Sequence, residues 1–263
     1  MLVYMSKYYL PRGMRNATLE ERRQFYMQEF SIAKVQGWLD LLKGKVKFAA
    51  VIGRHTKIYP EKYREDTGTT IIIDEYKGLD EVQAYLTEFL PEAAYYDRNV
   101  YDENDRKKGQ ELAFDLDPEN ITCPIQGTLA DKMQRHQGLG FCEIELDLVK
   151  EQAVNLCEHL EEQFSNMEIV YSGRGFHIHV FDPEAYAFSP KERRQIARKV
   201  KENGFKIDEW VTAGGMRLIR LPYSLHGLVS RVVVPVEKSE LETFDPIHDK
   251  RCLPRFLGSS ATS

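Results

Sequence analysis

Two aspartates lie one residue apart in the segment FDLDPEN. The flanking Phe114 and Leu116 are apolar and indicate a buried strand. Because strand side chains alternate between two faces, Asp115 and Asp117 are expected together on the opposite face. Two carboxylates that close repel each other unless a cation lies between them. Carboxylate oxygens suit Mg²⁺ or Mn²⁺, so the pair predicts a site for such an ion.

A second segment, YSGRGFHIHV, reads as a tight turn followed by a strand. Ser172 and Arg174 offer a hydroxyl and a guanidinium beside flexible glycine N–H groups, a combination that suits a phosphate. His177 and His179 share one face of the strand, and His177 could add a donor. Two satisfied or surface histidines are one alternative. A zinc site made by both histidines is another, and it would need a third ligand.

A third segment, KIDEWVTAGGMRLIRLPYSLHG, supplies Asp208 and further cations. Arg217, Arg220 and His226 are interleaved with apolar residues, so the cations could line one surface while their neighbours hold the core. An edge strand with ordinary surface arginines would give the same pattern. Together, three carboxylates, several phosphate-binding cations and no obvious nucleophile indicate metal-dependent phosphoryl transfer on a nucleotide.

Hydrophobic periodicity gives the elements that must position these groups. Predicted strands cover 47–53, 69–74, 111–117, 206–212 and 230–236, and two further strands share 167–181. Predicted helices cover 18–43, 78–90, 151–164 and 189–204. The sequence has no internal repeat and no long linker, so we predict one α/β (or α+β) catalytic domain of mixed sheets flanked by helices. It would span 1–257, with a helical part at 1–45 and a flexible tail at 258–263.

Bulk composition narrows the class of protein. The chain has 263 residues, of which 42% are hydrophobic and 29% charged, as in ordinary soluble globular proteins. No apolar run reaches about 18 residues and no signal-peptide pattern opens the chain, so no membrane contact is expected. Four cysteines in a chain of this size indicate a reduced, cytoplasmic protein. The net charge of -5 disfavours whole-surface nucleic-acid binding but allows a local basic groove.

The order of the three segments resembles the archaeo-eukaryotic primase superfamily, specifically the small catalytic subunit of archaeal primase and the stand-alone end-joining repair polymerases. The matching residues are FDLDP, YSGRGFHIHV, and IDEWVT with RLIRLPYSLHG, in that order. Upstream, VIGRH and AAYYDRNVY resemble the family's Arg-His element and Tyr-rich segment. The resemblance covers the chain from about Val51 to Val236. It implies a primase-polymerase core with an RRM-like element and a two-metal nucleotidyl transfer.

The resemblance also implies roles for individual residues. The ligands of two Mg²⁺ or Mn²⁺ ions would be Asp115, Asp117 and Asp208. The incoming nucleoside triphosphate would be held by Ser172, Arg174, His177, Arg220 and His226. One metal would lower the pKa of a primer 3′-hydroxyl and the other would bridge the triphosphate oxygens. The turn SGRGFH is one residue shorter than in the family, a departure that bears most on its arginine.

The family carries a zinc site between the first and second segments. Cys123, His136 and Cys142 lie where its ligands are expected, but Glu145 stands where a further cysteine belongs. A Zn²⁺ site with a carboxylate ligand and a lost zinc site both fit this pattern. Cys157 lies on an apolar helix stripe and is expected in the core.

Two basic regions are candidates for contacts with a DNA template or primer. The helical segment KERRQIARKVK contains Arg194 and Arg198, and a solvated helix face is its commoner explanation. The second region contains Arg54, His55 and Lys57. A repair polymerase that grips a downstream 5′-phosphate would need one of these regions as a pocket.

A single basic helix separates His179 from Asp208, where replicative primase subunits commonly carry a long insertion. This favours a DNA repair polymerase that fills short gaps in non-homologous end joining, with a DNA ligase and an end-binding protein as partners. The alternative is a primase small subunit that makes RNA primers beside a large subunit. Either would use NTP or dNTP. A non-catalytic nucleic-acid binding protein and a non-haem iron enzyme are other classes, disfavoured by the three aspartates and by RLIRLPYSLHG.

Overall fold

Two four-stranded antiparallel sheets organise residues 9–136 and 138–258, which the computed structural model describes. The first sheet has the order β2-β1-β3-β9, made by Thr70–Ile73, Phe48–Val51, Ala93–Asp97 and Leu218–Arg220. The second has the order β12-β7-β8-β6, made by Val234–Val236, Met167–Tyr171, Phe176–Val180 and Leu112–Leu116. Two short pairs are β4-β5 (Asn99–Tyr101, Lys107–Gln110) and β10-β11 (Leu225–His226, Arg231–Val232).

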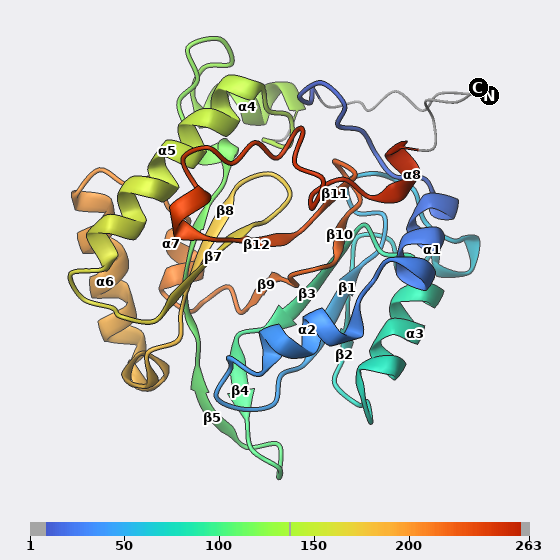
Figure 1. Ribbon diagram of the computed structural model, residues 1–263, viewed down its shortest axis with the longest axis horizontal. Coiled ribbons are helices and arrows are strands. Elements are labelled where there is room, and N and C mark those ends of the chain that lie inside the picture. The colour runs from blue at the N-terminus through green and yellow to red at the C-terminus, as the bar shows by residue number, and fades with distance from the viewer. Residues whose placement is uncertain (1–8, 137, 259–263) are drawn as a thin grey trace.

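Helices surround the two sheets. Figure 1 shows α1, α2 and α3 beside the strands of the first sheet, and α5 and α6 beside β7 and β8 of the second. The α-helices are α1 Leu19–Gln28, α2 Ile32–Leu39, α3 Leu79–Phe89, α4 Leu129–His136, α5 Glu143–Leu160, α6 Pro190–Glu202, α7 Glu209–Thr212 and α8 Arg255–Gly258. Short 3₁₀ helices are η1 Glu61–Tyr63, η2 Pro118–Asn120, η3 Pro183–Ala187 and η4 Lys238–Glu240. Among the described helices, none is long and apolar enough to span a bilayer.

This arrangement confirms a mixed α/β fold with several sheets and flanking helices. The RRM-like element and the domain bounds 1–257 stay predictions. The predicted tail falls largely on residues 259–263, which lie outside the described residues, as do the first eight residues of the predicted N-terminal part.

Alternation along β6 separates an apolar side of the second sheet from a polar side. Leu112, Phe114 and Leu116 are fully buried in the core that the sheet shares with α5 and α6. Asp115 is only partly covered and faces the other way, with His177 as its register partner on β8. The sequence prediction for this strand is confirmed. Helices α5 and α6 lie on the side of the sheet away from the carboxylates.

A buried polar network joins the two sheets behind this polar face. Tyr96 of β3 donates a hydrogen bond to Glu111 (2.8 Å), and Glu111 contacts His179 Nδ1 at 2.7 Å. The ring of Trp38 packs edge-on against His179, with centroids 4.9 Å apart. Because Glu111 and His179 are both fully buried, this network fixes how β3, β6 and β8 are placed relative to one another.

Cap residues explain where several helices begin. Thr18 and Glu21 form a capping box at the start of α1, and Ser189 with Glu192 forms one at the start of α6. The single helix predicted over 18–43 is wrong, because Ser31 caps a new helix with its hydroxyl and separates α1 from α2. The helix predicted over 151–164 begins earlier, at Glu143.

The strand predicted over 206–212 is also wrong. Asp208 Oδ1 accepts a hydrogen bond from Trp210 N (2.8 Å), and this local bond starts the short helix α7. The strand predicted over 230–236 is divided into β11 and β12. The amide of Val233, between them, bonds back to Ser224 O (2.9 Å) instead of continuing one ladder.

Candidate active site

The three aspartates singled out in the sequence meet at the free edge of the second sheet. The backbone N–H of Asp208 donates to Asp115 O (2.8 Å), which docks α7 against β6. Asp117 and Asp208 are both N-cap residues, of η2 and α7 respectively. Each cap bond leaves further carboxylate lone pairs free to bind a cation.

Like charges crowd this edge. Burial, followed by the charges of Asp117 and Asp208, raises the pKa of Asp115 well above its ordinary value. Glu119 adds a fourth carboxylate that the sequence analysis missed, although it stands two residues after FDLD. Burial and the charge of Asp117 raise the pKa of Glu119 to about 7. The arrangement favours a bound cation, since a divalent ion would remove the repulsion.

The turn between β7 and β8 is packed directly against these carboxylates. Any side chain at Gly175 would overlap Leu116 O of β6. At Gly173, which has a φ of +100°, a Cβ would lie 2.6 Å from the His226 ring. The turn is closed by Ser172, whose hydroxyl accepts from Gly175 N (3.2 Å). Glycine is therefore required at both positions for the turn to approach β6 and His226.

Several buried nitrogen atoms face this region without a hydrogen-bond partner among the described residues. They are His177 Nδ1, His226 Nδ1, Arg174 Nε and Arg220 Nη1. Burial lowers the pKa of His177 and of His226 well below the ordinary value, and neighbouring cations (His179 or Arg220) lower it further. Buried donors normally have acceptors, so this set fits an anionic ligand such as a triphosphate.

Arg174 lies beside two of the carboxylates. Its guanidinium pairs with Asp117 and lies 3.8 Å from Glu119 Oε2. It also donates to Gly138 O and Leu139 O, both at 3.4 Å. The structure therefore places Arg174 between the carboxylates and the segment after α4, and its role at the triphosphate stays a prediction.

Three other predicted triphosphate residues come from three different sheets. Arg220 lies on β9, where its guanidinium stacks over Tyr95 at 4.9 Å and donates to the Tyr95 hydroxyl (3.2 Å). His226 lies on β10 and is buried. His177 Nε2 approaches Asp115 Oδ1 at 3.5 Å. The structure thus brings together side chains that are separated by more than a hundred positions in the sequence.

His179 is engaged in the buried network with Glu111 and Tyr96, and this speaks against a metal shared by His177 and His179. Within residues 9–136 and 138–258, the one set of three potential ligands with atoms within 4.8 Å of each other is Cys123, Cys142 and Glu145. The oxygens of the three aspartates are spread more widely than that.

The cysteine set partly fits zinc. Cys123 and Cys142 Sγ are 3.7 Å apart, close to the roughly 3.8 Å expected for two sulfurs 2.3 Å from a tetrahedral Zn²⁺. However, Glu145 is paired with the buried ammonium of Lys132 (2.7 Å). Lys132 also donates to Pro118 O and Ile121 O, so a positive charge already compensates the carboxylate. Burial raises the pKa of Cys142 to about 11, which disfavours the thiolate. The side chain of His136 lies outside the described residues.

The two basic regions lie on different sides of the site. His55 is held by Glu92, whose carboxylate accepts from the His55 and Thr56 amides at 2.9–3.1 Å. Burial, with the charges of nearby arginines, lowers the His55 pKa. Arg54 donates to Gly68 O and Thr70 Oγ1. A nucleic-acid contact by either residue, or by the exposed Lys57, stays a prediction.

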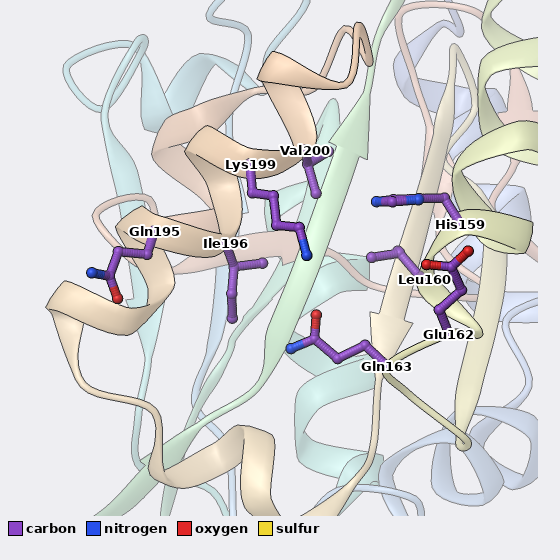
Figure 2. A pocket seen from close by; sticks show the side chains of 8 residues that line it. All are labelled: His159, Leu160, Glu162, Gln163, Gln195, Ile196, Lys199 and Val200. Carbon is purple, nitrogen blue, oxygen red and sulfur yellow. The ribbon is translucent and has the colours of Figure 1, made fainter.

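Arg194 and Arg198 are exposed on α6, which packs against α7. The two residues are one helical turn apart and therefore lie on the same face of the helix. Figure 2 shows another pocket, of about 430 Å³, that lies between α5 and α6 and includes His159, Gln195 and Lys199. It opens on the helical side of the second sheet, so the sheet separates it from Asp115.

Comparison with known proteins identifies relatives. No family model matches the chain. An uncharacterised DNA primase small subunit-like protein of Archaeoglobus fulgidus is 46% identical over 273 aligned positions, covering 97% of this chain and 95% of that protein. The DNA primase small subunit of Pyrococcus furiosus is 30% identical and is matched over 70% of this chain and 48% of its own length.

One solved structure shares the fold. The polymerase domain of Mycobacterium tuberculosis ligase D, in complex with DNA, superposes with a TM-score of 0.52 at 13% identity, covering 92% of this chain and 86% of that one. The chain therefore belongs to the DNA primase small subunit-like family of the archaeo-eukaryotic primase superfamily, a family of template-directed nucleotidyltransferases.

Proposed function

We propose that this protein is a metal-dependent, template-directed nucleotidyltransferase that adds nucleotides to the 3′-hydroxyl of a primer. The observation that carries the proposal is the meeting of four carboxylates with buried nitrogen donors at one edge of the second sheet. The carboxylates suit divalent cations and the donors suit phosphate, so the two halves match a nucleoside triphosphate with its metals.

Asp115, Asp117 and Asp208 would hold Mg²⁺ or Mn²⁺. The bound ions would activate the attacking hydroxyl and neutralise charge on the leaving pyrophosphate. The donors on His177, Arg220 and His226 would bind and orient the triphosphate. Neutral imidazoles suit this task, because each can donate one hydrogen bond to a phosphate oxygen while its other nitrogen accepts one.

Arg174 would hold Asp117 and Glu119 in place and limit their repulsion. Its contacts with the carbonyl groups of 138 and 139 fix the guanidinium at the rim of the site. A fixed cation beside metal ligands stabilises the carboxylate geometry before substrates arrive.

Within this activity we favour gap filling during DNA end joining, with a ligase and an end-binding protein as partners. The support is that only η3 and α6, with short loops, link β8 to α7, where replicative subunits commonly carry a long insertion. Synthesis of RNA primers with a primase large subunit is the second candidate, favoured by the names of the relatives.

Extension of labelled DNA would test the proposal. Substrates would be a short gap with a downstream 5′-phosphate, the same gap without it, and unprimed single strand, each with Mg²⁺ or Mn²⁺ and with NTPs or dNTPs. Asp115→Asn/Asp117→Asn is the inactive variant. Asp147→Asn is its matched control, since Asp147 is 77% exposed on α5.

Filling of the phosphorylated gap, lost in the double variant and kept in Asp147→Asn, is the expected result. Products from the unprimed strand alone would identify a primase and overturn the repair assignment. Equal incorporation by the wild type and the double variant would show that these aspartates do not carry the reaction.

A further inference from the structure

Trp210 is an exposed aromatic side chain beside the carboxylates. This residue is 74% exposed, although large apolar residues are usually buried in a folded domain. Trp210 stands two positions after Asp208, and the backbone N–H of Trp210 donates to the Asp208 carboxylate at 2.8 Å. The indole is thus carried by the same turn of α7 that presents a proposed metal ligand.

The indole packs on one side against the loop that follows α7, and the backbone of this loop is hydrogen-bonded. A Cβ at Gly215 would lie 3.2 Å from the ring, so the loop after α7 packs closely against it. Met216 N donates to Trp210 O (3.0 Å). Below the loop, the buried guanidinium of Arg98 donates to Val211 O and Met216 O, both at 2.5 Å. An exposed ring carried by a hydrogen-bonded backbone is suited to stacking with a planar group.

The same loop also lines a basic groove. Its volume is about 500 Å³, and its lining includes Gly214, Gly215, Lys107, Lys108 and Arg194. Lys107, Lys108 and Arg194 are exposed. A planar ring and a cationic groove that meet at the same loop match a nucleic-acid strand, which offers bases for stacking and phosphates for the cations.

The cations also extend along α6. Arg198 follows Arg194 by one turn, and Lys201 lies beyond it, paired with Glu209 of α7 (3.0 Å). Of this row, Arg194 lines the groove, and Lys201 contacts the helix that carries Trp210. Positive charge is therefore concentrated here in a chain whose net charge is -5, which favours a polyanion over an acidic or neutral surface as the occupant.

The topology indicates which strand would lie there. On β6, one edge pairs with β8, and the turn 172–175 approaches the carboxylates from that side. The opposite edge receives α7 through the bond from Asp208 N to Asp115 O. In phosphoryl transfer the attacking and leaving oxygens lie roughly in line, on opposite sides of the phosphorus. With the triphosphate at the turn, the attacking hydroxyl belongs on the side of α7.

We propose that Trp210 stacks on the terminal base of the primer, and that Lys107, Lys108 and Arg194 bind the phosphates behind it. This inference rests on the proposed function for its choice of strand. It assigns Trp210 as a positioning residue that places the 3′-hydroxyl near Asp208.

Binding measurements without chemistry test the inference directly. The affinity of a fluorescent primer–template would be measured by anisotropy in Asp115→Asn/Asp117→Asn protein, with and without Trp210→Ala. Stacking on an aromatic ring predicts a loss of roughly 5- to 150-fold for Trp210→Ala. Trp210→Phe should recover most of it. Tyr85→Ala, which removes another exposed aromatic on α3, should leave the affinity unchanged.

A separate measurement tests whether the nucleic-acid strand at Trp210 is the primer or the template. A 2-aminopurine at the primer 3′ end should be quenched by the wild type and not by Trp210→Ala. The same probe at the facing template position should respond equally to both proteins. Quenching that depends on Trp210 at the template position alone would overturn the assignment to the primer.

The groove can be tested through the salt dependence of binding. Lys107→Gln/Arg194→Gln should lower the slope of log affinity against log salt by about two. Lys250→Gln, an exposed lysine in the C-terminal region, is the control that should leave the slope unchanged. An unchanged slope in the double variant would refute the groove.

These outcomes separate the two proposals. Activity that depends on the aspartates, together with unchanged primer affinity in Trp210→Ala, would refute this inference and leave the proposed function standing. Primer binding that depends on Trp210, in a protein that incorporates no nucleotide on any substrate, would support this inference and refute the proposed function.

Discussion

Glu145 and Asp117 each pair with a buried cation, yet the two clusters are built differently. Around Glu145, every polar group has a partner. Lys132 reaches Glu145 and two carbonyl groups, and the second oxygen of Glu145 accepts from Cys142 N (2.8 Å). Lys132 and Glu145 are both fully buried. In such a pair each charge is already compensated by its partner, so the pair stabilises the fold around η2, α4 and α5.

Around Asp117 the charges do not balance. One guanidinium, from Arg174, faces Asp117 and Glu119, while Asp115 and Asp208 add further negative charge. The four carboxylate residues remain partly exposed. A cluster that is left with excess charge at the surface is stabilised when a cation binds. The comparison teaches that a balanced buried pair marks a structural element, and an unbalanced open cluster marks a binding site.

The largest effect is expected when the cation of the balanced pair is removed. Lys132→Met should lower the free energy of unfolding by about 3–5 kcal/mol, because it leaves Glu145 buried and uncompensated. Denaturant unfolding would measure this loss. Lys132→Met/Glu145→Met should recover a large part of it, since neither charge is then left alone. A change below about 1 kcal/mol in Lys132→Met would show that the pair is not the stabilising feature.

At the open cluster, removal of one charge should have the opposite effect on stability. Asp115→Asn should reduce nucleotide incorporation by roughly 10²–10³-fold or more, the scale seen when a group that stabilises charge in the transition state is lost. Its unfolding free energy in EDTA should rise, since repulsion with Asp117 and Asp208 is relieved. Kinetics and thermal unfolding of the same preparation would check both signs. A variant that is less stable in EDTA would contradict the crowding of charge described above.

The pH dependence of stability should also differ between the clusters. The pKa of Glu119 is raised to about 7 and that of Asp115 is raised as well, so the folded state holds protons that the unfolded state releases. Stability of the metal-free protein should therefore fall as pH rises from about 4.5 through 7. Mg²⁺ or Mn²⁺ should raise the Tm more at pH 7.5 than at pH 5.5. A metal effect that is the same at both pH values would argue against binding at these carboxylates.

The smallest expected effect concerns an exposed cation. Arg198→Gln should weaken binding of DNA a few-fold and reduce the salt slope by about one, without altering the KM for the nucleotide. Lys199→Gln is the matched control on the same helix, because Lys199 faces the pocket of Figure 2 instead. Equal effects of both variants would mean that α6 contributes only diffuse charge.

Much of this organisation could be predicted from the sequence, because local patterns determine it. Alternation identified β6 with its aspartates, and cap residues identified the start of α6. Asp208 lies beside Asp115 as the proposed metal site requires, although the strand predicted for its segment is wrong. There, a side-chain cap outweighed the β propensity of the segment.

Contacts between distant segments could not be predicted. Lys132 reads as an exposed residue of an amphipathic helix, and its burial depends on carbonyl groups of 118 and 121 and on Glu145 of another helix. Arg174 likewise pairs with Asp117 across 57 positions. No local pattern encodes such pairs, because each depends on how whole elements pack.

The two tryptophans of the chain stand in opposite surroundings, and this has a spectroscopic consequence. Trp38 is buried edge-on against His179, whereas Trp210 projects into water beside Asp208. Their emission should therefore differ, with the buried indole shifted to the blue and the exposed one to the red. A single spectrum then separates two events: loss of blue emission reports separation of the sheets, and loss of red emission reports occupation of the primer side.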